Sequence, residues 1–148
     1  MSNEPGFNFD PSGVAAWVAA SADAEHTEGT RLFVLGDTDD WGAPAVVILD
    51  MPPGYTLFRH AHTCQRFEVV VKGSLEVDGQ LVGPGHVMTA APGEFYGPHV
   101  AGSQGCQTAE VFGDLEGVFR ILTEQPDGSV REYDARKGEL PPEFEILA

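Results

Sequence analysis

Basic side chains are scarce in this sequence. Its 148 residues include 8 Lys and Arg against 23 Asp and Glu, which gives a formal net charge of −15 at pH 7. A surface of that sign repels the phosphate backbone of nucleic acids and the anionic headgroups of lipids. We therefore expect no nucleic-acid partner and no binding to a membrane surface.

Long apolar runs and cysteines are also few. No uninterrupted apolar run reaches the roughly 18 residues of a membrane-spanning helix, and the start MSNEPGFNFD lacks the positive end and apolar stretch of a signal peptide. The two cysteines, Cys64 and Cys106, are too few for a disulfide scaffold. We expect a cytoplasmic protein with two free thiols.

Short apolar segments fill the middle of the chain, and turn residues bound each of them. They are rich in Val, Phe, Leu, Ile and Thr, which is typical of β-strands. The dipeptide Asp78-Gly79 lies between two of them and predicts a hairpin. Many short strands without helical patterns between them predict an all-β fold, an antiparallel sandwich or barrel. The segments are 31–36, 44–50, 55–62, 66–73, 74–79, 86–90, 108–112 and 117–124.

One helix is predicted, near the N-terminus. Asp10 can cap it, Pro11 suits its first position, and the apolar stripe that follows extends the expected span over 11–20. The sequence thus predicts three parts. They are an N-terminal arm with this helix (1–30), a barrel (31–124) and a C-terminal extension (125–148) that packs on the barrel or on a partner subunit.

Two histidines, His60 and His62, are separated by a single residue within a predicted strand. Alternate residues of a strand point to the same face, so the two imidazoles lie side by side. Neutral imidazoles held in this way can supply two adjacent corners of a metal coordination polyhedron. The pair therefore indicates either a metal site or a polar lining of a ligand pocket.

At this point the sequence resembles the cupin family. Most of the chain, about residues 31–124, follows the order of the two cupin motifs. The matching positions are Gly54, His60, His62 and Gly73 in the first motif, and Gly85 and Gly93 in the second. The resemblance implies a double-stranded β-helix, a small jelly-roll barrel that is often dimeric and carries a metal in its mouth.

Two positions depart from the family pattern. Arg66 stands in the place of the first motif's glutamate, and Tyr96 in the place of the second motif's histidine. His99 can replace that histidine if the Gly97-Pro98 turn bends the chain. Glu68 shares a strand face with Arg66 and can act as the fourth ligand. Alternatively, a turn shorter by one residue points Gln65 inward and turns Arg66 and Glu68 outward.

We therefore expect one divalent transition metal, Fe, Mn or Zn, on His60, His62 and His99, with Gln65 or Glu68 as a weaker fourth ligand. The resemblance implies a dioxygenase-like enzyme acting on a small organic molecule. Tyr96 is then a pocket wall or an acid–base group, and Arg66, if inward, binds a substrate carboxylate.

Two other functions stay open. One is a cupin that binds a small molecule or a metal without turnover. The other is a metal-free isomerase or epimerase with His60 as base and Tyr96 as acid, although the net charge of −15 weighs against a nucleotide substrate.

A homodimer is predicted as well. One face of so small a barrel would otherwise expose apolar side chains, which the sequence predicts to be Val69, Val71 and Leu75. Packing of one sheet against the same sheet of a second copy would cover them.

Overall fold

A computed structural model of the chain describes residues 31–37 and 39–143, and in these ranges the protein is built almost entirely of strands. The predicted helix over 11–20 lies outside the described residues. The strands are β1 (Arg31–Val34), β2 (Ala45–Met51), β3 (Thr56–Leu57), β4 (Ala61–His62), β5 (Arg66–Val77), β6 (Gln80–Val82), β7 (Val87–Ala90), β8 (His99–Phe112), β9 (Arg120–Glu124) and β10 (Val130–Asp134). One short helix, α2 (Leu115–Phe119), and a 3-10 turn, η2 (Ala135–Lys137), complete the described elements.

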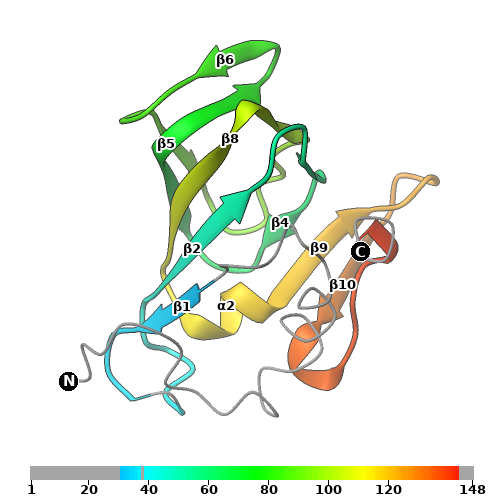
Figure 1. Ribbon diagram of the computed structural model, residues 1–148. Helices are drawn as coiled ribbons and strands as arrows, with labels where there is room; N and C mark the ends of the chain where they lie inside the picture. Colours follow the sequence, from blue (N-terminus) through cyan, green and yellow to red (C-terminus); the bar gives the residue numbers. More distant parts are fainter. Residues whose placement is uncertain (1–30, 38, 144–148) are drawn as a thin grey trace.

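The strands form two antiparallel sheets. The larger sheet has the order β1-β2-β8-β5-β6, with β3 also paired to β8 and β7 to β5. The smaller sheet has the order β10-β9-β4. Figure 1 shows β2, β8 and β5 side by side in one layer, with β9 and β10 forming a separate ribbon beyond α2. The predicted all-β class is confirmed.

The core is made by the inward faces of these sheets. The largest fully buried side chains include three residues of α2, which are Leu115, Val118 and Phe119. Two residues of β5, Val70 and Leu75, are also fully buried. Burying an aliphatic or aromatic side chain of this size contributes roughly 1.5–3 kcal/mol to folding. Among the described residues, no helix is long and apolar enough to cross a lipid bilayer.

The two longest strands, β5 and β8, do not pair evenly. Their register shifts between Val70 and Lys72 and again between Gly73 and Leu75. Such irregularities reverse the in–out alternation of a strand. Leu75 is consequently fully buried, which corrects its predicted place on an exposed face, whereas Val71 is 46% exposed.

Two predicted strands are interrupted. Segment 55–62 forms β3 and β4, with His60 joined between them by an isolated bridge to Tyr96. Segment 117–124 begins as α2 because Asp114 caps that helix, its carboxylate accepting from the Gly117 N–H at 2.6 Å. Within the C-terminal extension, β10 pairs with β9. The boundaries of the three predicted parts stay a prediction.

Candidate functional site

His60 and His62 are held in one tautomer by the backbone. The Nδ1–H of His60 donates to the Phe58 carbonyl at 2.6 Å, and that of His62 to the Gly117 carbonyl at 2.7 Å. A carbonyl can only accept, so the proton lies on Nδ1 and each Nε2 carries a lone pair. Burial lowers the pKa of His60 to about 3 and also lowers the pKa of His62, so both rings are neutral.

Tyr96 closes over this pair. Its hydroxyl donates to His60 Nε2 at 2.9 Å, and its ring centroid lies 4.6 Å from that of His60. Two backbone hydrogen bonds between His60 and Tyr96 fix the two residues side by side. Burial raises the pKa of the Tyr96 hydroxyl well above its ordinary value, so the phenol stays protonated. The pair thus forms a neutral His–Tyr hydrogen bond in the barrel.

Arg66 lies beneath Tyr96 with its side chain only 1% exposed. Its guanidinium carbon is 3.6 Å from the centroid of the Tyr96 ring, a cation–π contact. Nη2 donates to Glu68 at 2.8 Å and Nε to Glu110 at 3.2 Å. A buried cation is thus held between two carboxyl groups and an aromatic ring.

The two carboxylates beside Arg66 are directly opposite each other on β5 and β8. Burial, together with the nearby charge of Glu110, raises the pKa of Glu68 to about 8, against a smaller opposing effect of Arg66. Burial alone would lower the pKa of Arg66, but Glu110, Tyr96 and Glu68 raise it, so the guanidinium stays charged. The cluster Arg66–Glu68–Glu110, here called the buried charge triad, thus carries one cation between two carboxyl groups.

A polar hollow of about 340 Å³ opens next to these groups. Its lining includes Arg66, Tyr96 and His99, with Arg59 and His86 nearer the surface. His99 is buried, its ring centroid is 5.9 Å from that of Tyr96, and its Nδ1 has no hydrogen-bond partner. Burial lowers the pKa of His99 to about 4. The hollow, called here the mouth pocket, thus combines one buried cation with neutral hydrogen-bonding rings.

The structure brings most of the predicted site residues together but leaves Gln65 out. Gln65 is exposed, and its backbone carbonyl accepts from the Gly113 N–H. Arg66 and Glu68 point inward and Phe67 is 43% exposed, so the register that would turn Gln65 inward is wrong. The charged residues can lie inside because each has an ion-pair partner there.

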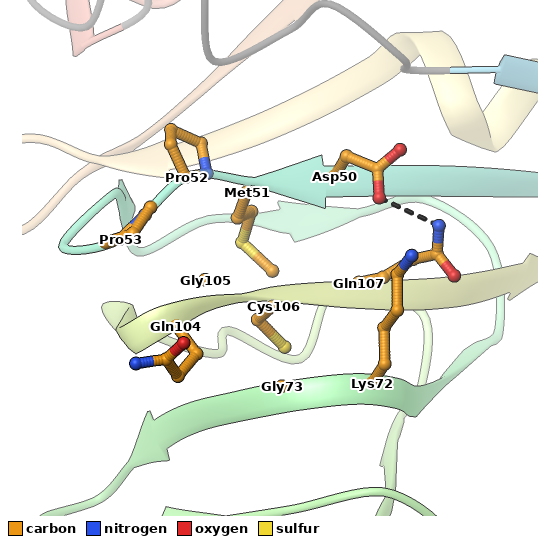
Figure 2. Close-up of a pocket in the computed structure, with 10 residues that line it drawn as sticks. All are labelled: Asp50, Met51, Pro52, Pro53, Lys72, Gly73, Gln104, Gly105, Cys106 and Gln107. Atoms are coloured by element: carbon orange, nitrogen blue, oxygen red, sulfur yellow. Dashed lines mark hydrogen bonds between the residues drawn. The ribbon is translucent and has the colours of Figure 1, made fainter.

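A second hollow of about 420 Å³ lies at the bend of β5 and β8. Figure 2 shows Met51 and Cys106 in it, with the Gln107 amide donating to Asp50 at 2.8 Å across neighbouring strands. Lys72 is the one basic side chain among its lining residues. This hollow has none of the histidines, so the chemistry of the chain is better placed in the mouth pocket.

Comparison with solved structures finds this arrangement of strands in other proteins. An acetylacetone dioxygenase from Acinetobacter johnsonii matches with a TM-score of 0.52 at 14% identity, covering 81% of this chain and 79% of that one. A proposed acetylacetone dioxygenase from Methylibium petroleiphilum PM1 gives a TM-score of 0.50 at 17% identity, covering 74% and 77%. An RmlC-like cupin from Ralstonia eutropha JMP134 gives 0.48 at 16% identity, covering 78% and 72%.

The chain has the cupin fold. At these identities the likeness is one of fold. Scans against protein-family models and a search of curated proteins find no match. The chemistry of this chain therefore has to be argued from its own side chains.

The cupin pattern implies a metal, and the donors present here do not fit one. His60 and His62 have the tautomer that a metal ligand needs, but the lone pair of His60 Nε2 already accepts from Tyr96. Among the described residues, no group of three or more His, Cys, Asp or Glu side chains is arranged to hold a metal ion. The guanidinium of Arg66 adds repulsion.

Sequence reasoning missed Glu110, which belongs to this cupin's site. Glu110 is a buried side chain in a segment that reads as an ordinary strand, and its partner Arg66 is 44 residues away. One signal was available. If Glu110 lies on the inward face of its strand, its buried carboxylate needs a positive charge nearby. Arg66 was the one cation in the motif region whose role the sequence left open.

Proposed function

We propose that this cupin binds a small organic anion in the mouth pocket, with Arg66 as the group that recognises the negative charge. The observation that carries the proposal is the buried guanidinium of Arg66 in the wall of the mouth pocket. A carboxylate or enolate oxygen in the pocket could accept a hydrogen bond from it, and charge-assisted hydrogen bonds are the stronger ones. The unpaired Nδ1 of His99 supports a polar ligand at the same wall.

Proton transfer is the reaction that we propose for such a ligand. The 2.9 Å hydrogen bond from Tyr96 to His60 supports it, because Nε2 of His60 can accept the phenol proton while the phenol oxygen takes a proton from the ligand, and the reverse transfer returns it. This corresponds to the acid–base alternative drawn from the sequence. The predicted dioxygenase-like activity needs a metal, which the donor set does not fit. Binding without turnover is the outcome if the His–Tyr pair proves dispensable.

The binding proposal is tested with a panel of small carboxylic acids and β-diketones, measured by calorimetry. We expect Arg66→Met combined with Glu68→Gln to weaken anion binding about 10- to 100-fold, because one charge-assisted hydrogen bond is lost. Glu68→Gln is included because it removes the carboxyl group that would lose its ion-pair partner when Arg66 is replaced.

Glu68→Gln alone is the matched control, because it keeps the guanidinium. If both proteins bind the anions with equal affinity, Arg66 is not the recognition group. Neutral analogues of the same shape should bind both proteins equally weakly.

We further propose that the chain forms a homodimer through the outer face of the larger sheet. Phe67 and Val87, on neighbouring strands, are 43% and 53% exposed there, and Val69 is partly buried beside them. Phe67 also lines a hollow together with Thr89 and Val111. Exposed apolar surface of this kind marks an interaction face.

The mass in solution tests the dimer. Light scattering should give the mass of two chains, and Phe67→Glu should shift it to one chain, because a charge would be buried in the interface. Val130→Glu is the control, since Val130 is 54% exposed on the other sheet. A single-chain mass for the unmodified protein at micromolar concentration would reject the dimer.

A further inference from the structure

We infer that Arg66 takes the place of a metal ion in this cupin: its guanidinium keeps divalent metals from the histidine pair and supplies the positive charge at the pocket instead. The inference deepens the proposed function, on which its second half rests. Its first half, the exclusion of metal, stands on the geometry of the pair alone.

The position of the charge is the first step. Arg66 lies under the ring of Tyr96, and Tyr96 is bonded to His60. The charge of Arg66 is among the causes that lower the pKa of His60, His62 and His99, so the cation is close to all three imidazoles. A metal ion held by these rings would lie near the guanidinium, and the two cations would repel each other.

The use of the remaining donors is the second step. Glu68 and Glu110 are buried carboxylates on facing strands, and both are bonded to Arg66. The hydroxyl of Tyr96 points at the lone pair of His60 that a metal would need. His60, Glu68 and Glu110 are therefore each engaged by another side chain of the site, whereas Nδ1 of His99 has no hydrogen-bond partner.

The third step is the electrical balance. A divalent metal ion bound to two neutral histidines would bring two positive charges into the site. Arg66 brings one. One carboxylate of the triad can be neutralised by a proton, which matches a single buried cation to a single buried anion. The fixed guanidinium thus supplies a donor of positive charge to an anion in the pocket without a metal ion.

The test converts the site into a metal site. Arg66→Glu, Glu68→Gln and Tyr96→His are combined, which removes the cation and places two new donors beside His60 and His62. Zinc and manganese are titrated into the tag-free protein, with bound metal measured after dialysis. We expect stoichiometric metal in the triple variant and only traces in the unmodified protein. Arg66→Gln, Glu68→Gln and Tyr96→Phe together form the matched control without donors.

A milder pair guards against a triple variant that does not fold. Arg66→Gln with Glu68→Gln should bind zinc at least about 10-fold more tightly than Glu68→Gln alone, because only the former lacks the guanidinium. Equal affinities would overturn the inference. One firmly bound metal per unmodified chain, lost on replacing His60 and His62 with Ala, would overturn it as well.

The two proposals fail separately in these experiments. The metal titrations need no organic ligand, so they decide the exclusion even if no anion binds. If metal is excluded but the anion panel shows no dependence on Arg66, the proposed function fails and the exclusion stands.

Discussion

Arg66→Met should lower the free energy of unfolding by about 3–5 kcal/mol, the usual cost of removing one partner from a buried ion pair. The guanidinium is 1% exposed and bonded to two carboxyl groups that are themselves 0% and 8% exposed. Methionine fills most of the volume, so the cost is chiefly electrostatic. Denaturant unfolding followed by circular dichroism measures it.

The loss of stability caused by Arg66→Met should increase as the pH rises. The pKa of Glu68 is raised from 4.5 to about 8 in the folded protein, so the folded state holds its proton more tightly and stability falls as pH rises through this interval. Arg66 opposes that rise, so its removal raises the pKa of Glu68 further and extends the fall above pH 8. The loss caused by Arg66→Met should therefore be larger at pH 9 than at pH 6.

Glu68→Gln provides the control for this dependence. Added to Arg66→Met, it removes one uncompensated carboxylate and should restore part of the lost stability at pH 9 but little at pH 6. A cost of under about 1 kcal/mol for Arg66→Met, independent of pH, would mean that solvent reaches the triad and that it is not a buried ion cluster.

The sequence was sufficient for the strands and for the histidine pair. Alternation within a strand places His60 and His62 on one face whatever the rest of the fold does. The turn at Gly97-Pro98 and the family spacing placed His99 and Tyr96 near them. In the structure the ring of Tyr96 lies within 6.3 Å of each of the three histidine rings, measured between centroids.

The direction of Arg66 could not be decided from the sequence. The alternation of side chains allows two orientations of the strand after His62. In one of them Arg66 points inward, and in the other Phe67 does. Burial of the apolar Phe67 favoured the orientation that turns Arg66 outward. The structure adopts the other orientation, because Glu110 of β8 lies across the sheet from Glu68 and helps to neutralise the buried guanidinium. The alternation of residues near Arg66 contains no information on Glu110, because the two residues are far apart in the sequence. Our proposal of a guanidinium site in place of a metal site depends on that one contact.

Gly73→Ala, at the bend of β5 and β8, should lower the free energy of unfolding strongly. Gly73 has a φ of 78°, and a Cβ added there would overlap the carbonyl oxygen of Gly105 and lie 2.9 Å from its carbonyl carbon. Backbone cannot move aside as a flexible side chain does, so the two strands must separate at the point where their register shifts. Gly79 is the matched control, since its φ is 79° but nothing lies within 4 Å of an added Cβ.

Gly79→Ala should therefore lower the free energy of unfolding by only the cost of holding an alanine in the left-handed conformation, roughly 1–2 kcal/mol. Gly73→Ala should cost roughly 1–3 kcal/mol more, the usual range for overpacking in a tight interior. Separation of β5 from β8 would also turn Leu75, which the bend buries completely, toward solvent. The denaturant midpoints of the two variants measure the difference. Equal midpoints would show that the close approach of Gly73 to Gly105 does not hold β5 in the register that points Arg66 and Glu68 inward.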